Sequence, residues 1–318
     1  MSAIVEVKNL KKYFRTRHGA LTAVDDVCLS IEKGKTLGVV GESGCGKSTL
    51  GRTIVHLLDS TGGKIYFKGE DITKARGRTL KKVRENMQII FQDPFSSLNP
   101  RLTVKQTISE PLILSRRFKG GEIETETKRI MDVVGISGRF AESYPHELDG
   151  GRRQRIGIGR ALALNPEFVV CDEPVSALDV SIQAQILNLI KELQREFGMA
   201  LMFITHDLSV VKHISHNICV MYLGKLVEMS PSNELFRSPL HPYTKALLSA
   251  IPSTDIHNKK TRILLQGEVV SPINPKPGCR FAARCSYSCD KCYEEQPLEE
   301  VLPDHYVSCC RVREINDI

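Results

Sequence analysis

The chain of 318 residues contains no tryptophan, and phenylalanine and tyrosine supply only 6% of it. A surface that binds single-stranded nucleic acid by stacking bases on aromatic rings is therefore not expected. Positive charge is in small excess, because 44 basic and 37 acidic residues leave a net charge of +7. This excess is compatible with an anionic ligand, a membrane surface or nucleic acid, and it does not choose among them.

Long hydrophobic runs are absent as well. A membrane-spanning helix needs about 20 apolar residues, whereas the longest apolar stretches, such as 200–204 and 218–223, have the length of strands. The first residues lack the positive start and apolar centre of a signal peptide. We therefore expect the chain to remain in the cytosol.

Short apolar segments and helical patterns alternate along much of the chain. Residues 36–40, 168–171 and 200–204 have the composition of buried strands, and apolar residues recur at helical spacing from 182 to 197. This alternation predicts an α/β fold with a largely parallel central sheet.

The composition changes near Pro252, and the polar stretch 253–260 indicates a linker. Prolines and cysteines become frequent beyond it. We therefore expect a main domain of residues 1–252 and a small C-terminal extension of residues 253–318.

A glycine-rich segment follows the first of these strands and fits the pattern G-x-x-x-x-G-K-[ST] of phosphate-binding loops. Its residues are Gly41, Glu42, Ser43, Gly44, Cys45, Gly46, Lys47, Ser48 and Thr49. Backbone N–H groups of such a loop surround phosphate oxygens, and the helix expected over 48–58 adds a partial positive charge at its N-terminus. We expect Lys47 to reach the β- and γ-phosphates of a nucleotide and the Ser48 hydroxyl to bind Mg²⁺.

The segment 168–173 supplies complementary acidic groups, because this apolar strand ends in Asp172 and Glu173. Asp172 can hold Mg²⁺ through water, and Glu173 can orient and deprotonate an attacking water molecule. Alone, such an ending is often only the end of a strand. Together with the phosphate loop it predicts a nucleotide-hydrolysing site.

With these motifs, residues 4–250 resemble the nucleotide-binding subunits of ATP-binding cassette (ABC) transporters. The resemblance implies a RecA-like core with an antiparallel β subdomain and a helical subdomain at about 95–160. The C-terminal extension would add a small cysteine-rich, metal-binding appendage. The implied activity is ATP hydrolysis coupled to transport, with ATP and Mg²⁺ as ligands.

The resemblance also implies roles for single residues. Gln92, in the sequence Phe-Gln-Asp-Pro, matches the Q-loop glutamine that links Mg²⁺ and the attacking water to the membrane partner. His206 matches the switch histidine that contacts the γ-phosphate. Phe14 matches the aromatic residue that stacks on adenine, with Tyr13 as the alternative. The implied D-loop consists of Ser176, Ala177, Leu178 and Asp179.

One motif departs from the family pattern. The signature Leu-Ser-Gly-Gly-Gln is replaced here by Leu148, Asp149, Gly150, Gly151 and Arg152. In the family this segment faces the γ-phosphate bound by the opposite subunit, so an ionised Asp149 would repel that phosphate, and Arg152 could offset the charge. We therefore expect an asymmetric pair of ATP sites, in which this chain works with a different ATPase subunit.

The longer stretch 91–101 closely resembles the ATPases of oligopeptide and dipeptide importers, a group that includes nickel importers. Segments 241–247 and 278–285 are similar to the same group. This resemblance implies a second, non-identical ATPase, two transmembrane permease subunits and an extracytoplasmic solute-binding protein. It also implies a peripheral location on the cytoplasmic face of the membrane. The expected function is to energise peptide import, with nickel or another small solute as the alternative cargo.

Six of the ten cysteines lie between residues 279 and 310. In a reducing compartment such a cluster indicates a metal site before it indicates disulfides. Four of the six suit an iron–sulfur cluster or a structural zinc ion, and the resemblance implies a [4Fe–4S] cluster. Cys289 and Cys310 could substitute as ligands, and uncoordinated thiols are the remaining alternative. The four expected ligands are Cys279, Cys285, Cys292 and Cys309.

Two other classes of function compete with transport. A non-transport ABC ATPase of translation or DNA repair usually carries two cassettes or a long coiled-coil insertion, and this sequence has neither. The mild net charge gives no concentrated nucleic-acid footprint, so no nucleic-acid partner is expected. A redox- or metal-sensing regulator would use the cysteine segment and would leave the nucleotide site without a role.

Overall fold

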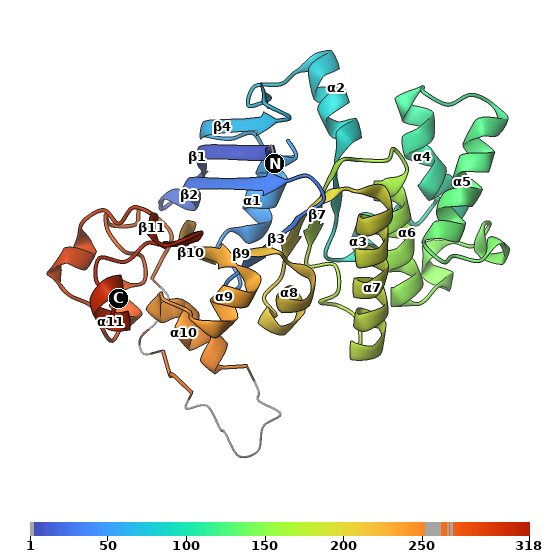
Figure 1. Ribbon diagram of the computed structural model, residues 1–318. Helices are drawn as coiled ribbons and strands as arrows, with labels where there is room; N and C mark the ends of the chain where they lie inside the picture. Colours follow the sequence, from blue (N-terminus) through green and yellow to red (C-terminus); the bar gives the residue numbers. More distant parts are fainter. Residues whose placement is uncertain (1–2, 252–261, 266, 268–269) are drawn as a thin grey trace.

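The computed structural model describes residues 3–251, 262–265, 267 and 270–318 (Figure 1). The linker expected at 253–260 lies outside these residues. Two sheets form the framework, and a group of helices lies to one side of them (Figure 1). Within the described part of the chain, no helix combines the length and the apolar character needed to cross a membrane.

The smaller sheet is antiparallel and has the strand order β2-β1-β4-β5. Alternate residues of its long strands point into the core: Val5, Val7 and Leu10 are buried on β1, and Val27 and Leu29 on β2. Such alternation is typical of a sheet with one face in the core and one in water. The strands are β1 (Ala3–Thr16), β2 (Gly19–Glu32), β4 (Gly62–Phe67) and β5 (Glu70–Asp71).

The larger sheet has the order β11-β12-β10-β9-β3-β8-β7-β6. Its five strands from β9 to β6 are parallel, as the sequence predicts, and three more antiparallel strands extend one edge. Strands β3, β7 and β8 are buried at every position, which explains their continuous apolar sequences. The strands are β3 (Thr36–Val40), β6 (Met87–Ile90), β7 (Phe168–Asp172), β8 (Ala200–Ile204), β9 (Asn217–Tyr222), β10 (Lys225–Pro231), β11 (Glu299–Leu302) and β12 (His305–Val307).

Helix α1 (Lys47–Ile54) lies between the two sheets, where Leu50 and Ile54 join a core built from both. The helix is shorter than the expected 48–58, because His56 adopts a left-handed backbone with φ of 56° that ends the helical path. Helix α2 (Gly77–Asn86) then leads to β6 at the edge of the large sheet.

A second core forms where four helices between β6 and β7 pack against one another and against α7 (Val180–Phe197). They occupy the stretch for which a helical subdomain is expected, and they project to one side of the sheets (Figure 1). These helices are α3 (Pro94–Ser97), α4 (Val104–Ser115), α5 (Gly121–Val133) and α6 (Gly150–Leu162).

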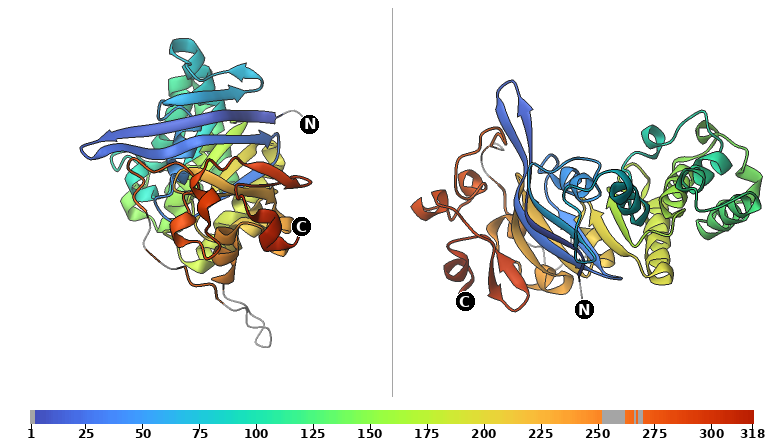
Figure 2. Two further views of the ribbon diagram at one scale, coloured as in Figure 1. Left: turned by 90° about the vertical axis from the view of Figure 1, so that its left-hand side faces the viewer. Right: turned by 90° about the horizontal axis from the view of Figure 1, so that it is seen from above.

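The C-terminal extension packs against the rest of the chain. Its strands β12 and β11 lie beside β10 and continue the large sheet (Figure 2). Phe281 is buried in a core shared with β9 and α10. Residues on both sides of the expected boundary near residue 252 therefore share one core, and the division into two domains stays a prediction. The remaining helices are α8 (Leu208–Ile214), α9 (Ser232–Arg237), α10 (Pro242–Ser249) and α11 (Val312–Asn316).

A buried carboxylate fixes the extension to this sheet. Glu228 on β10 is fully buried and accepts the backbone N–H groups of Leu240 at 2.7 Å and His241 at 3.0 Å. The Nε2 atom of His305 on β12 lies 2.7 Å from the same carboxylate. Because a buried charge is costly unless it is hydrogen-bonded, these contacts make the pairing of β10 and β12 specific.

We predict that His241 makes the protein less stable as the pH falls from 6.5 towards 4. Burial lowers the pKa of His241 to about 4, although nearby Glu228 acts in the opposite direction; an unfolded histidine titrates near 6.5. In this window the unfolded state binds more protons. The contribution is therefore intact above pH 6.5, and about 2 kcal/mol is lost between pH 7 and pH 5.

Chemical unfolding at pH 7 and pH 5 measures this loss. In the folded protein His241 Nδ1 accepts the N–H of Tyr243 and caps α10. His241→Asn keeps a capping oxygen but does not titrate, so its stability should fall less than that of the wild type. Equal losses in the two proteins would contradict the prediction.

Candidate active site

The glycine-rich loop connects β3 to α1 and passes very close to two other strands. A Cβ atom at Gly46 would lie 2.0 Å from the carbonyl oxygen of Ala23, and one at Gly41 would lie 2.1 Å from that of Met221. Both glycines also have positive φ, 105° and 153°. Only glycine combines this backbone conformation with such a close approach. The loop path is therefore set by backbone packing against β2 and β9.

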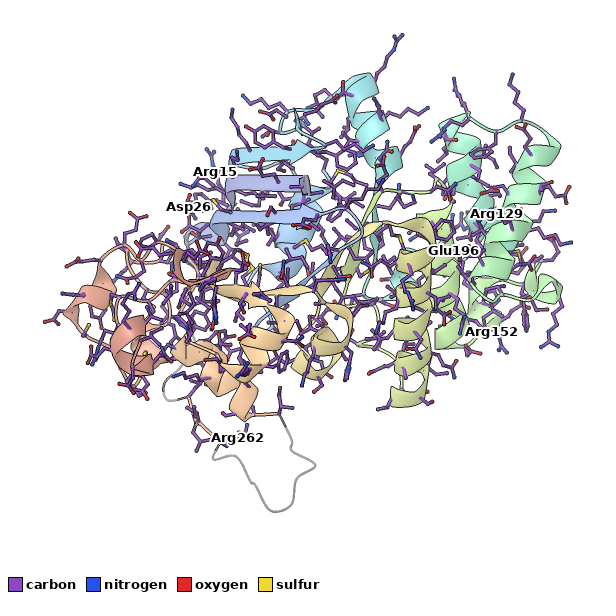
Figure 3. The ribbon with its side chains drawn as sticks, in the orientation of Figure 1. Arg15, Asp26, Arg129, Arg152, Glu196 and Arg262 are labelled. Atoms are coloured by element: carbon purple, nitrogen blue, oxygen red, sulfur yellow. The ribbon has the colours of Figure 1, made fainter. Side chains whose placement is uncertain are left out.

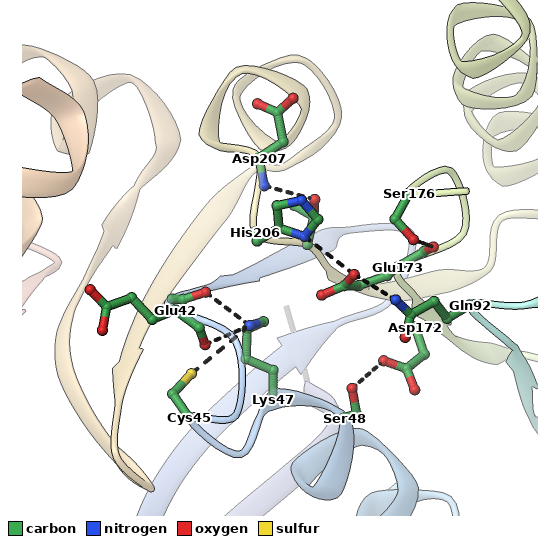
Figure 4. A network of polar contacts seen from close by, with 12 residues as sticks. Glu42, Cys45, Lys47, Ser48, Gln92, Asp172, Glu173, Ser176, His206 and Asp207 are labelled. Carbon is green, nitrogen blue, oxygen red and sulfur yellow. Dashed lines mark hydrogen bonds and ion pairs between the residues drawn. The ribbon is translucent and has the colours of Figure 1, made fainter. Parts of the chain in front are cut away.

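Lys47 begins the helix that follows and is almost completely buried. Its Nζ atom donates to the carbonyl oxygens of Gly41 at 2.8 Å and Glu42 at 3.0 Å, and it lies 4.0 Å from the Sγ atom of Cys45 (Figure 4). The ammonium group thus lies within the loop that is expected to bind phosphate. Phosphate oxygens can replace the carbonyl oxygens as its acceptors.

A cavity of about 400 Å³ opens beside this loop. Phe14 lines it, whereas the hydroxyl of Tyr13 donates to Asp25 at 2.5 Å. Of the two aromatic candidates for adenine stacking, Phe14 is therefore the one that faces the cavity. The lining residues are Phe14, Leu21, Thr22, Ala23, Ser43, Gly44, Gly46, Lys47, Ser48, Thr49, Gln92, Glu173, Leu223, Gly224 and Pro272.

Ser48 and Asp172 meet where a magnesium ion is expected. The Ser48 hydroxyl donates to Asp172 Oδ1 at 2.6 Å, and Arg52 Nη2 lies 3.1 Å from Asp172 Oδ2. Asp172 is fully buried at the end of β7, so the guanidinium of Arg52 balances its charge. Hydroxyl and carboxylate oxygens are the ligands that Mg²⁺ prefers, and this pair fits the ion.

Glu173 lies at the centre of the polar groups around the cavity. Its Oε2 atom accepts from Gln92 Nε2 at 3.0 Å and lies 3.2 Å from His206 Nδ1 (Figure 4). Its backbone has a φ of 47°, which is uncommon for a residue with a side chain and is often found at active sites. The structure therefore brings together the three residues predicted to be catalytic.

The two segments expected to serve a partner subunit lie outside the cavity. Ser176 in the D-loop donates to the carbonyl oxygen of Glu173 at 3.2 Å, and Asp179 caps α7. Asp149 caps α6 by accepting the N–H of Arg152 at 2.7 Å, and its other oxygen pairs with Arg152 Nη1 at 2.5 Å. Arg152 projects from the helical subdomain, far from the C-terminal extension (Figure 3).

Four residues that the sequence analysis did not single out reach the nucleotide cavity or its walls. Tyr243, Arg280 and Arg284 lie in the segments 241–247 and 278–285 that support the resemblance to peptide importers, but the sequence gives no sign of what any of the four residues touches. Only the folded chain brings them to residues 13–49. They are Tyr243, Pro272, Arg280 and Arg284.

The cysteine segment contains two overlapping groups of thiols. Sγ of Cys292 lies 3.8 Å from that of Cys289 and 3.7 Å from that of Cys310, so these three sulfur atoms form the tightest group. Cys292 is the only one of the four expected ligands in it. Cys289 and Cys292 come close because Cys289 is the N-cap of the short 3-10 helix Asp290–Tyr293, which contains Cys292.

The four expected ligands nevertheless share one neighbourhood. The backbone N–H of Cys279 donates to the carbonyl oxygen of Cys292 at 2.7 Å. Burial, with smaller contributions from the thiols of Cys292, Cys309 and Cys285, raises the pKa of Cys279 to about 11. Thiols that influence one another in this way would be stabilised as thiolates by a metal centre. The donor set therefore fits a thiolate-bound metal.

Comparison with known proteins agrees with this geometry. Residues 24–176 match the family described as ABC transporter, and residues 227–292 match the family described as oligopeptide/dipeptide transporter, C-terminal region. The second match begins in β10 and runs through the cysteine segment to Cys292. It therefore covers the part of the chain that contacts the phosphate loop from the C-terminal side.

Curated relatives match over nearly the whole chain. The oligopeptide transport ATP-binding protein AppF of Bacillus subtilis is 50% identical, with 96% of each chain covered. The oligopeptide transport ATP-binding protein OppF of Escherichia coli is 48% identical, over 96% of this chain and 93% of its own. Among solved structures, a dimeric ATP-binding cassette in a post-hydrolysis state bound to ADP and Pi is 30% identical. It covers 72% of this chain and 98% of its own, with a TM-score of 0.66.

Proposed function

The chain belongs to the family of ATP-binding proteins of oligopeptide ABC transporters, and on this basis we propose that it energises the import of oligopeptides or dipeptides. One observation carries the proposal: a complete ATP-hydrolysing constellation lies in a chain whose C-terminal region also matches peptide transporters.

The residues around the cavity divide the hydrolysis of ATP among themselves. The loop N–H groups and Lys47 bind the phosphates, and the side chain of Phe14 stacks on adenine. Magnesium held through Ser48 and Asp172 would offset the charge on the phosphate oxygens. Glu173 accepts a proton from the attacking water, and Gln92 and His206 hold its carboxylate in position.

Transport requires partners outside this chain. We propose that it pairs with a second, non-identical ATPase beneath two transmembrane permease subunits, on the cytoplasmic face of the membrane. A solute-binding protein would deliver the peptide. ATP can drive the transport cycle only if it binds the closed ATPase pair more tightly than the open pair.

The decisive experiment measures ATP turnover by the reconstituted complex, with and without a peptide-loaded binding protein. We expect the loaded protein to stimulate turnover, and Glu173→Gln to reduce the stimulated rate about 100-fold or more. ATP affinity should be unchanged. Glu167→Gln, at the residue just before β7, makes the same chemical change outside the cavity and should retain activity.

Stimulation that survives in Glu173→Gln would assign hydrolysis to the partner's site. If no peptide stimulates turnover but nickel does, the cargo is the alternative one. Co-purification of nucleic acid would support a non-transport ATPase, and a response to redox or metal alone would support a regulator.

We also propose that the two ATP sites are unequal because of Asp149. Its carboxylate is paired with Arg152 and its side chain is 56% exposed, so it keeps a negative charge where the family signature has a hydroxyl. In the closed pair this charge would face the phosphate bound by the partner subunit. The salt bridge to Arg152 reduces the repulsion. The carboxylate of Asp149, however, has no hydrogen to donate to the phosphate, whereas a serine hydroxyl does.

Asp149→Asn tests this asymmetry, because asparagine keeps the cap of α6 and removes the charge. We expect ATP turnover by the complex to rise roughly fivefold, which corresponds to about 1 kcal/mol, the energy of two charges 4 Å apart in water. Asp149→Ser should raise ATP turnover by at least the same factor. The melting temperatures should match that of the wild type, and unchanged turnover in both variants would refute the asymmetry.

We propose that the cysteine segment binds a [4Fe–4S] cluster through Cys279, Cys285, Cys292 and Cys309. Such a centre would crosslink a segment too short to form a large core. The zinc alternative has its own support. Sulfur atoms that bind one zinc ion at about 2.3 Å in a tetrahedron lie about 3.8 Å apart, close to the spacing of Cys289, Cys292 and Cys310. The two sets share Cys292, so one chain holds only one of them.

Metal analysis of anaerobically purified protein distinguishes the two sets. For an iron–sulfur cluster we expect about four iron atoms per chain, which Cys285→Ser abolishes and Cys310→Ser retains. For a zinc ion bound by Cys289, Cys292 and Cys310, Cys310→Ser should abolish binding and Cys285→Ser should retain it. Stoichiometric binding of neither metal would leave the thiols uncoordinated and overturn both assignments.

A further inference from the structure

An arginine of the cysteine segment is bonded directly to the phosphate loop. Arg284 Nη1 lies 2.9 Å from Glu42 Oε2 and 3.2 Å from Oε1, and 3.3 Å from the hydroxyl of Tyr222. Its side chain is only 10% exposed. A charge-assisted bond at so buried a position is directional and little screened by salt. The phosphate loop is therefore held from a part of the chain that lies outside the ATP-binding core.

The backbone of Glu42 is held as well. Its N–H donates to the hydroxyl of Tyr243 at 2.9 Å, and its carbonyl oxygen accepts from Lys47 at 3.0 Å. Tyr243 is fully buried and packs against Tyr222 and Phe281. The Glu42 side chain points away from Lys47 (Figure 4), and its carboxylate accepts from Arg284 of the C-terminal extension. Glu42 is not among the residues that line the cavity, and its carboxylate is bonded within the protein.

A second arginine makes a parallel link to the adenine side of the cavity. Arg280 Nη2 lies 2.6 Å from Asp25 Oδ2, and its Nη1 donates to the carbonyl oxygen of Leu223 at 3.1 Å. Leu223 lines the cavity. Arg280 follows Cys279, and Arg284 precedes Cys285. The two arginines therefore join both walls of the cavity to the cysteine segment.

We propose that Arg284 is a positioning residue for ATP binding, which acts through Glu42 to hold the phosphate loop in its binding conformation. A glycine-rich loop loses much conformational freedom when it orders around phosphate. A loop that is already fixed pays less of this entropy when ATP binds. ATP affinity consequently depends on the C-terminal cysteine segment. The inference concerns the ATP site and holds for any transported solute.

Arg284→Gln tests the proposal in the full-length chain, with a fluorescent ATP analogue for affinity and the reconstituted complex for turnover. We expect Kd for ATP to rise about tenfold, the effect of one lost charge-assisted hydrogen bond. Turnover at saturating ATP should stay within about twofold of wild type, because Arg284 contacts none of the reacting groups. Arg284→Lys keeps the charge and should show a smaller loss of affinity.

Arg311→Gln is the matched control. It makes the same substitution in the same segment, at an ion pair with the exposed Glu314, and should leave Kd unchanged. A double-mutant cycle then tests the route. If Arg284 acts through Glu42, then Arg284→Gln combined with Glu42→Gln should weaken ATP binding no more than the stronger single change.

A Kd for Arg284→Gln equal to that of Arg311→Gln would overturn the proposal. So would a double variant whose rise in Kd is the product of the rises in Arg284→Gln and Glu42→Gln alone. If Arg284→Gln fails to fold, the Kd for ATP of Glu42→Gln tests the proposal instead. A wild-type Kd in Glu42→Gln would refute it. Affinity is measured on the chain itself, so failure of peptide import and failure of this inference are distinguishable.

Discussion

The close approach of the phosphate loop to two strands is the contact on which the site depends. Gly46 lies against the carbonyl group of Ala23 and Gly41 against that of Met221, at distances that leave no room for a side chain. This packing places Lys47 and Ser48 at the carboxyl edge of the parallel strands. Asp172, Glu173 and His206 lie at the same edge because β7 and β8 end there. Parallel pairing thus brings the polar chemistry of distant segments to one place.

Charge compensation is the second feature that organises the molecule. Arg52 balances the buried Asp172, Arg284 pairs with Glu42, and Arg280 pairs with Asp25. Each pair crosses between elements far apart in the chain, so each fixes their relative position as well as their charge. The pair of Asp149 and Arg152 differs, because both residues belong to one helix end and are exposed. It leaves a negatively charged signature that only a partner subunit would meet.

The C-terminal extension is a structural part of the ATP site. Its strands continue the large sheet, Glu228 and His305 anchor them, and Pro272 lines the nucleotide cavity. The Thr22 N–H donates to the carbonyl oxygen of Pro272 at 3.0 Å, which joins the extension to the adenine side. A change in the cysteine segment can therefore reach the nucleotide through bonded contacts.

Local sequence alone predicted strands β3, β7 and β8, the phosphate loop and the acidic end of β7, because periodicity and short motifs are set by neighbouring residues. The helix after the loop was predicted too long, since the left-handed turn at His56 has no signal in the pattern. Resemblance to a family added Gln92 and His206, which both contact Glu173, and Phe14, which lines the same cavity as Gln92.

The tertiary structure alone decided which residues meet across long stretches of chain. The choice between Phe14 and Tyr13 depended on where β1 lies relative to the cavity. The contact of Arg284 with Glu42 and the grouping of Cys292 with Cys289 and Cys310 also needed the fold. Residues 42 and 284 are 242 positions apart. Sequence periodicity records which face of an element is buried, but it carries no record of which distant side chain lies opposite.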